Sequence, residues 1–132
     1  MTGGYLIDTD WVIHHLNGHS KITKRLDELK AQDLAISLIT LAELYDGIYV
    51  SRDPAGSELT LLEFLNDVRL IGLDEETARL FAKDRGRLRA AGSLIGDFDL
   101  LIGVTAIQNG LTLLTNNRRH FERIDGLNIE SL

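Results

Sequence analysis

Short apolar runs alternate with longer amphipathic segments along the chain, and this alternation is the strongest constraint on its fold. Four of the runs have the character of buried strands, at residues 5–7, 34–37, 68–73 and 111–115. Strands that alternate with helices form a parallel sheet covered by helices on both faces. The sequence therefore predicts an α/β fold, a three-layer α/β/α domain around a central parallel sheet of four to five strands. A short run near residues 127–129 would supply the fifth strand.

The helices are bounded by recognisable start and stop signals. Asp53-Pro54 is a capping residue followed by proline at the first helical position, and Gly110 follows the last long helix. In the helix after Pro54, the spacing predicts that Leu59, Leu62 and Leu65 face the core. Helices are expected over residues 11–16, 20–29, 54–66, 75–92 and 96–109, with one more that Thr40 opens and that carries Leu41, Leu44, Tyr45 and Ile48.

Length and composition narrow the classes of protein further. We expect residues 1–132 to form one domain, which is an ordinary length for a single core. The absence of cysteine excludes thiol catalysis and disulfides, and the net charge of −6 argues against a generic basic coat for nucleic acid. No basic stretch precedes an apolar run at the N-terminus, and no apolar stretch approaches the ~20 residues of a membrane helix. A cytoplasmic protein with no membrane association is expected.

Acidic and polar side chains follow the predicted strands. They are Asp8 and Asp10 after the first strand, Thr40 and Glu43 after the second, Asp97 and Asp99 before the fourth, and Thr115, Asn116 and Asn117 after the fourth. In such sheets the ligand site lies beyond the carboxyl ends of the strands. Carboxylates gathered there would repel by roughly 3–4 kcal/mol per pair at an effective dielectric of about 20. Oxygen ligands suit Mg²⁺, with Mn²⁺ as the alternative, so a hard divalent cation is the natural counter-charge.

Each of these residues also has a purely structural interpretation. Asp8 or Asp10 could cap a helix. Thr40 and Glu43 fit a capping box, and acids in the first turn of a helix, such as Asp99, favour its dipole. Position alone does not separate capping from chemistry, because helix starts and strand ends coincide in this architecture.

Basic and aromatic residues have two possible interpretations as well. One group comprises Arg79, Lys83, Arg85, Arg87 and Arg89, and another comprises Arg118, Arg119 and Arg123. Both groups could face a substrate or could be solvated charge. His120 could touch a phosphate, but simple exposure is the plainer expectation, and Trp11 is expected to pack in the core.

Four segments of the chain, in order, resemble the motifs of PIN domains. They are Tyr5-Leu-Ile-Asp8-Thr-Asp10, Ile39-Thr-Leu-Ala-Glu43-Leu-Tyr-Asp-Gly47-Ile, Ile95-Gly-Asp-Phe-Asp99-Leu-Leu-Ile-Gly103, and Leu113-Leu-Thr115-Asn-Asn117 with Phe121. Their order and spacing resemble the VapC toxins of bacterial type II toxin–antitoxin pairs. The resemblance covers nearly the whole chain and implies a metal-dependent endoribonuclease with a three-layer α/β/α fold.

The resemblance also implies roles for individual residues. Asp8, Glu43 and Asp99 match the family's catalytic acids, and Asp8 and Asp99 would hold Mg²⁺. Asp97 is an accessory candidate, while Thr115 and Asn117 would orient Asp8 or the waters around the metal. Asn117 stands where the family often has a fourth acid, which is a departure. Candidates for holding the RNA backbone are Arg85, Arg89, Arg118 and Arg119.

Partners are implied in the same way. A VapC-like chain would cleave RNA, pair with a small antitoxin that has a basic tail, and form a homodimer within the toxin–antitoxin complex.

Two other interpretations remain open at the level of sequence. Asp8-Thr-Asp10-Trp-Val12 also matches the nucleophile motif of haloacid-dehalogenase-like phosphatases, in which Asp8 would attack phosphate and Asp10 would act as acid and base. Alternatively, the chain is a catalytically inactive PIN domain that binds only RNA or a partner protein.

Overall fold

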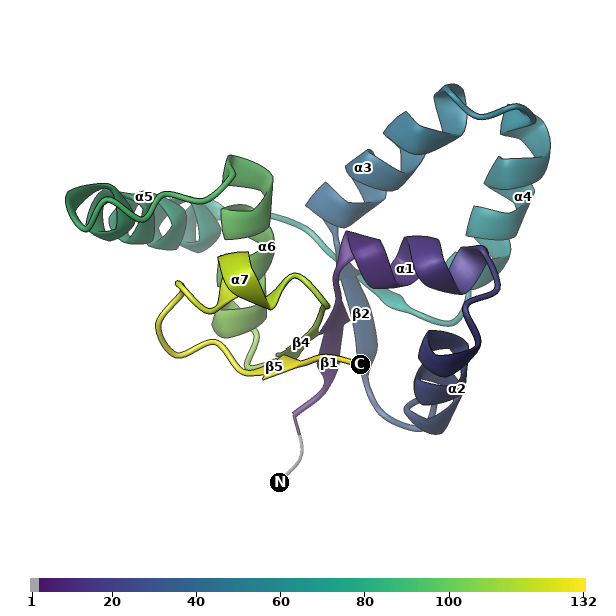
Figure 1. Ribbon diagram of the computed structural model, residues 1–132, viewed down its shortest axis with the longest axis horizontal. Coiled ribbons are helices and arrows are strands. Elements are labelled where there is room, and N and C mark those ends of the chain that lie inside the picture. The colour runs from purple at the N-terminus through teal and green to yellow at the C-terminus, as the bar shows by residue number, and fades with distance from the viewer. Residues whose placement is uncertain (1–2) are drawn as a thin grey trace.

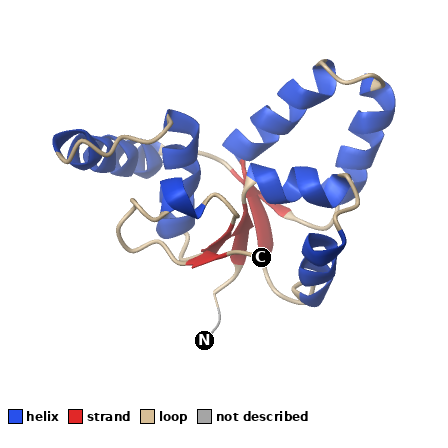
Figure 2. Cartoon of the chain, viewed as in Figure 1, coloured by secondary structure: helices blue, strands red, loops and turns tan. Residues whose placement is uncertain are grey.

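The computed structural model describes residues 3–132, and a five-stranded parallel sheet lies at its centre (Figures 1 and 2). The strands are β1 (Tyr5–Ile7), β2 (Leu34–Ser37), β3 (Arg69–Ile71), β4 (Thr112–Leu114) and β5 (Ile129–Glu130). Their order across the sheet is β3-β2-β1-β4-β5, and every neighbouring pair is parallel. The predicted parallel sheet is therefore confirmed at its upper limit of five strands.

Helices cover both faces of this sheet. They are α1 (Thr9–Leu16), α2 (Ser20–Glu28), α3 (Leu38–Tyr49), α4 (Pro54–Leu65), α5 (Glu75–Ala90), α6 (Asp97–Gln108) and α7 (Arg118–Phe121). In Figure 1 the first four helices lie to the right of the sheet and the last three to the left. The three-layer α/β/α arrangement is confirmed. No helix of residues 3–132 is long and apolar enough to cross a membrane.

Alternation along the strands divides the hydrophobic core into two halves. Leu6 and Leu113 face the layer of α5, α6 and α7, whereas their neighbours Ile7 and Leu114 face the layer of α1 to α4. All four side chains are fully buried. Because both faces of the sheet are covered, its central strands read as continuous apolar runs.

Helix α3 begins earlier than the sequence indicated. Ser37 is its N-cap, and the Ser37 hydroxyl accepts a hydrogen bond of 3.0 Å from the Thr40 backbone N–H. The prediction that Thr40 opens the helix is wrong, because Ser37 already supplies a capping oxygen three residues earlier. As a result, Thr40 is fully buried in the first turn, beside the end of β1.

The buried face of α4 also differs from the prediction. Leu61 and Phe64 are the buried residues, while Leu59 is 64% exposed and Leu62 is 44% exposed. The inward assignment was wrong for Leu59 and Leu62 because α4 has apolar residues on more than one face, so periodicity could not select the packed one. Leu65 does pack against the core, as expected.

The C-terminal segment forms two short elements after β4. Helix α7 was not expected from the sequence, and β5 begins at Ile129, where a strand had been expected over 127–129. Backbone pairing sets the register of β5, with Ile129 opposite Leu113 and Glu130 opposite Leu114. The Glu130 carboxylate also accepts hydrogen bonds of 2.6 and 3.0 Å from Arg25, which ties β5 to α2.

Candidate active site

Side chains from four distant segments meet at the carboxyl edge of the sheet. Asp8 follows β1, Glu43 lies on α3, Asp99 lies in the first turn of α6, and Thr115 follows β4. Thr115 donates a hydrogen bond of 2.7 Å to Asp8, and Thr9 donates one of 2.7 Å to Glu43. Asp99 is close enough to Asp8 for its charge to raise the pKa of Asp8.

Asp8 is the most buried acid of the group, with 4% of its surface exposed. Burial is the largest cause that raises its pKa to about 7, and the neighbouring charges of Asp10 and Asp99 raise it further. Hydrogen bonds from the Thr115 hydroxyl and the Thr9 backbone act in the opposite direction. A buried acid with a pKa near neutrality, at a sheet edge beside two other acids, is a typical functional-site arrangement.

None of the three principal acids acts as a helix cap. Asp8 stands at the N-cap position of α1, but its side chain makes no capping hydrogen bond. The proposed capping box between Thr40 and Glu43 does not form, since Glu43 bonds to Thr9 across 34 residues of chain. Asp99 lies in a first turn whose N-cap is Gly96 and faces His120. The capping interpretation left open by the sequence therefore does not account for Asp8 or Glu43, whereas Asp99 does lie in a first turn, where an acid favours the helix dipole.

Asp10 holds the loop that follows β4. Its Oδ2 atom accepts a hydrogen bond of 3.1 Å from the Asn116 backbone, and the Asn116 side chain accepts one of 3.0 Å from the Trp11 indole. These two bonds fix the loop between Thr115 and Asn117. Trp11 is fully buried, as predicted, and it also anchors this loop. The other oxygen of Asp10 is buried with no hydrogen-bond partner among residues 3–132.

Asp99 has neighbours that sequence reasoning missed. The His120 Nδ1 atom lies 2.9 Å from Asp99 Oδ2, and the Asn117 side-chain nitrogen lies 3.5 Å from the same oxygen. His120 had been expected to be simply exposed, but its side chain is only 43% exposed and contacts Asp99. Thr9, next to Asp8 in the chain, was likewise overlooked. Its hydroxyl joins Glu43 to the end of β1 and lies 3.1 Å from the Thr40 hydroxyl.

Several candidate RNA-binding arginines are already paired with acids. Arg85 forms an ion pair of 2.9 Å with Asp97. Arg118 pairs with Glu122 at 3.0 Å. In contrast, Arg89 and Arg119 form no ion pair with any residue in the part of the chain that the structure describes.

The donor set fits a single hard cation held by few protein ligands. Within residues 3–132, no three His, Asp or Glu side chains lie close enough together to form a complete metal cage. The carboxylates of Asp8 and Asp99 are hard oxygen donors, and the charge of Asp99 acts on Asp8. Mg²⁺ typically uses one or two carboxylates and keeps several waters, so an incomplete cage of this kind suits it.

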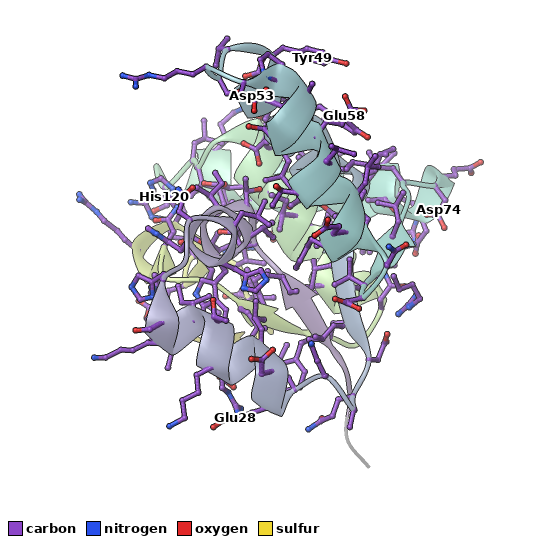
Figure 3. All side chains as sticks on the ribbon, turned by 90° about the vertical axis from the view of Figure 1, so that its right-hand side faces the viewer. Glu28, Tyr49, Asp53, Glu58, Asp74 and His120 are labelled. Carbon is purple, nitrogen blue, oxygen red and sulfur yellow. The ribbon has the colours of Figure 1, made fainter. Side chains whose placement is uncertain are left out.

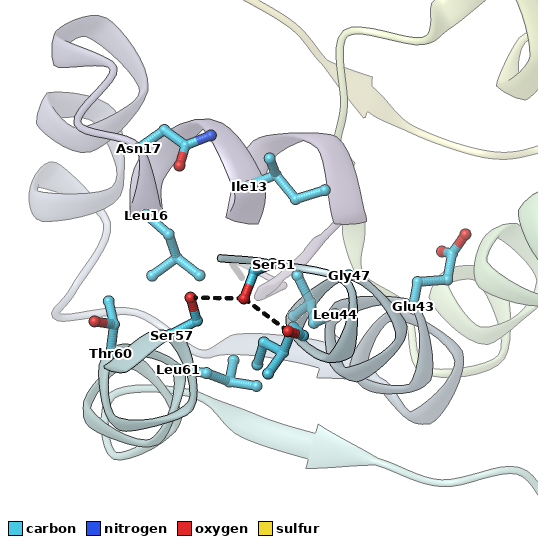
Figure 4. A pocket seen from close by; sticks show the side chains of 11 residues that line it. Ile13, Leu16, Asn17, Glu43, Leu44, Gly47, Ser51, Ser57, Thr60 and Leu61 are labelled. Carbon is cyan, nitrogen blue, oxygen red and sulfur yellow. Dashed lines mark hydrogen bonds between the residues drawn. The ribbon is translucent and has the colours of Figure 1, made fainter. Parts of the chain in front are cut away.

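An apolar groove leads away from Glu43 between α1, α3 and α4 (Figure 4). Its volume is about 310 Å³. Ile13, Leu16 and Leu44 line its walls, Ser57 and Thr60 lie at one end, and Glu43 lies at the other end with its carboxylate directed away from the groove. A ligand in this groove would therefore lie next to one of the three principal acids.

Comparison with known proteins identifies relatives across the full length of the fold. The family model described as PIN domain matches residues 5–127. "Ribonuclease VapC2" of Rickettsia felis is 33% identical over 129 residues, which cover 96% of each chain. "tRNA(fMet)-specific endonuclease VapC" of Salmonella typhimurium is 29% identical over 126 residues, again 96% of each chain.

Solved structures agree with the sequence matches. VapBC2 from Rickettsia felis, bound to a DNA fragment from its promoter, contains a chain that superposes with a TM-score of 0.91 at 32% identity. That match covers 97% of this chain and 98% of the other. DNA-bound VapBC from Salmonella typhimurium gives the same TM-score at 29% identity, with 98% of each chain covered.

Proposed function

This chain belongs to the VapC ribonuclease toxins of the PIN-domain family, and from that premise we propose that it hydrolyses RNA at Asp8, Glu43 and Asp99 with a divalent metal ion. The buried Asp8 carboxyl carries this proposal. Its raised pKa reflects burial beside Asp10 and Asp99, a cost that a bound cation would offset. Mg²⁺ is the proposed ion, and Mn²⁺ is expected to substitute for it.

Asp8 and Asp99 would hold the metal ion, with Thr115 orienting Asp8. A divalent cation bound there neutralises charge on the phosphoryl oxygens and lowers the pKa of a water that it holds. Thr9 occupies one oxygen of Glu43, which leaves the other oxygen to orient the attacking water and accept its proton. The water oxygen would then bond to phosphorus as the bond to the 3′-oxygen breaks, and the 3′-oxygen would take a proton from solvent to become the 3′-hydroxyl.

This route determines the ends of the products. Attack by water leaves a 5′-phosphate on one fragment and a 3′-hydroxyl on the other, and it does not use the ribose 2′-hydroxyl. The alternative 2′-hydroxyl route usually needs a general base and a general acid beside the ribose. Among the described residues, His120 is the one histidine hydrogen-bonded to a site acid, so a histidine pair is not assembled there.

Recognition of the RNA backbone is proposed to rest on the basic residues that are not committed to ion pairs. Arg89 and Arg119 are the better candidates, because binding phosphate through Arg85 or Arg118 would first require breaking a contact with Asp97 or Glu122. Phosphate contacts of this kind contribute affinity without sequence preference.

The experiment is cleavage of labelled RNA in Mg²⁺, in EDTA, and by three variants in Mg²⁺. Asp8→Asn, Glu43→Gln and Asp99→Asn are each expected to lose most of the activity while remaining folded. RNA that includes initiator tRNA is a sensible substrate set, given the name of the Salmonella relative. A folded wild-type protein that binds Mn²⁺ but leaves every RNA intact would favour the inactive, binding-only interpretation.

We also propose a basic antitoxin peptide as the partner that occupies the groove. Residues 38–65, which form α3 and α4, hold five acidic side chains against one arginine. In Figure 3, Tyr49, Asp53 and Glu58 lie together at the tip of this helix pair. A peptide with apolar residues for the groove walls and basic residues for Glu43 and the surrounding acids fits both features. The two solved relatives are VapBC assemblies, and VapBC proteins form a family of toxin–antitoxin systems, which supports this choice of partner.

A further inference from the structure

One oxygen of Asp99 is already engaged by the protein before any ligand binds. The His120 Nδ1 atom lies 2.9 Å from Asp99 Oδ2. The Asp99 side chain is 25% exposed and the His120 side chain is 43% exposed, so the contact lies at the mouth of the site. No hydrogen bond within residues 3–132 involves the other oxygen, Oδ1.

The chemistry of the two groups fixes the direction of this hydrogen bond. An ionised carboxylate can only accept, so the imidazole must donate from Nδ1. The Asn117 side chain lies 3.0 Å from the same ring nitrogen and 3.5 Å from Asp99 Oδ2. Nδ1 carries a single proton, and Asp99 is its acceptor, because the Asn117 side-chain nitrogen can only donate hydrogen bonds. That nitrogen is itself directed at Asp99 Oδ2.

The backbone holds the ring in place. His120 lies on the one-turn helix α7, directly before Phe121, which is fully buried in the core beside α6. Ile124 is also buried there, and its side chain packs so closely on Gly103 of α6 that a Cβ atom at Gly103 would clash with it. Two buried anchors thus fix α7 relative to α6, the helix that carries Asp99.

We propose that His120 is a positioning residue for Asp99. Its Nδ1–H holds Oδ2 and leaves Oδ1 to the metal ion, an inference that rests on the metal role proposed above for Asp99. Hydrogen bonds from neighbouring groups orient metal-binding side chains in this way, and their loss typically costs about 10–100-fold in metal affinity or activity. His120 itself is not assigned as a metal ligand, since no group of three such residues forms among the described residues.

Two substitutions of His120 distinguish the contribution of Nδ1 from that of Nε2. The side-chain nitrogen of His120→Asn stands where Nδ1 stands, whereas the nitrogen of His120→Gln reaches the position of Nε2. His120→Ala removes both. Mn²⁺ affinity of the full chain is measured by isothermal titration calorimetry, and kcat and KM for RNA are measured in parallel.

We expect His120→Ala and His120→Gln to lose about 10–100-fold in Mn²⁺ affinity, with His120→Asn within a few-fold of wild type. The activity loss should fall on kcat, with KM for RNA little changed. Melting temperatures should stay close to wild type, because the side chain is half exposed. Unchanged Mn²⁺ affinity in His120→Ala would overturn the proposal, as would a larger loss in His120→Asn than in His120→Gln.

Asp99→Asn is the reference that keeps the two proposals apart. If Asp99→Asn weakens Mn²⁺ binding and the His120 variants do not, only the positioning role fails. If Asp99→Asn binds Mn²⁺ as wild type does, the metal role of Asp99 fails, and the positioning role fails with it.

Discussion

The Thr115 hydroxyl donates a hydrogen bond of 2.7 Å to Asp8 Oδ2, and this bond joins the end of β4 to the end of β1 across 107 residues of sequence. Thr115 is fully buried and Asp8 nearly so. The same hydroxyl oxygen accepts a bond of 3.0 Å from the Asn117 backbone, so one side chain links the buried acid to the loop that leads to α7. This loop is in turn held by Asp10 through Asn116.

Thr115→Val is expected to lower activity by about 10–100-fold, since it removes a group that orients a proposed metal ligand. It keeps the volume of the side chain but leaves Asp8 Oδ2 buried without its donor, at a cost of about 1–3 kcal/mol. RNA cleavage and thermal melting both measure the effect. Thr115→Ser keeps the hydroxyl and should retain most of the activity; equal losses in both variants would contradict a role for the hydrogen bond.

Asp8→Asn should stabilise the metal-free protein near neutral pH, although it abolishes activity. The pKa of Asp8 is about 7 in the folded chain, against an ordinary value of 3.8. The folded state therefore binds this proton more tightly than the unfolded state, and the stability of the wild type falls as pH rises from about 4 through 7. The gap between the two pKa values corresponds to about 4 kcal/mol when the group is fully ionised.

Thermal melting in EDTA between pH 4 and 8 measures this effect. The melting temperature of Asp8→Asn minus that of the wild type should increase as pH rises. The difference should be smallest at pH 4, where Asp8 is protonated. If the melting temperatures of the two proteins changed with pH in parallel, ionisation of Asp8 would not destabilise the folded state. That result would contradict the raised pKa of Asp8.

Asp10→Asn separates the nuclease from the phosphatase that the sequence alone allowed. In the structure, Asp10 accepts a backbone hydrogen bond from Asn116, and an asparagine oxygen can accept the same bond. We therefore expect RNA cleavage within about 10-fold of wild type, because no proton transfer through Asp10 is required. Asp10→Asn should also relieve repulsion on Asp8. Loss of activity as complete as in Asp8→Asn would contradict a purely supporting role for Asp10.

Gly47→Leu is expected to block the antitoxin while leaving the nuclease intact. Gly47 lies on α3 and lines the groove, and a Cβ atom built there meets nothing within 4 Å. A side chain can therefore start at this position without a clash of its Cβ atom, and leucine favours the helix by roughly 0.5–1 kcal/mol relative to glycine. Co-purification with the antitoxin from the neighbouring gene should be lost, and RNA cleavage should persist.

Gly86→Leu provides the matched control for the groove. Gly86 also lies in a helix, α5, and a Cβ atom placed on it would likewise meet nothing within 4 Å, but it does not line the groove. This variant should bind the antitoxin as wild type does. If Gly47→Leu also binds normally, the groove is not the site of the antitoxin.

The fold could be predicted from the sequence because its signals are local. The apolar runs at 5–7 and 34–37 predicted strands that the structure contains. Asp53-Pro54 predicted the start of α4, and Gly110 predicted the end of α6. The buried face of α4 could not be predicted in the same way. Leu61 and Leu62 are adjacent and equally apolar, and tertiary packing decides that Leu61 is buried and Leu62 is exposed.

The sequence indicated which acids lie at the edge of the sheet and that Thr115 would contact Asp8, but it did not indicate the other supporting contacts. Asp8, Glu43 and Asp99 each follow a strand or open a helix, and the resemblance to PIN domains selects them as the candidate acids among the polar residues there. Thr9 contacts Glu43, 34 positions away, and His120 contacts Asp99, 21 positions away. No local sequence pattern predicts either contact. Spacing does place His120 three residues after Asn117, on the same side of a helical turn, which was the one available signal.

The most direct test of whether the site holds a metal ion is isothermal titration calorimetry with Mn²⁺ in the absence of RNA. It is carried out on the wild type, Asp8→Asn and Asp99→Asn. We predict one Mn²⁺ per wild-type chain and at least a 10-fold loss of affinity in each variant, with all three proteins folded. Undiminished Mn²⁺ binding by either variant would contradict the claim that Asp8 and Asp99 share a metal ion at the edge of the sheet.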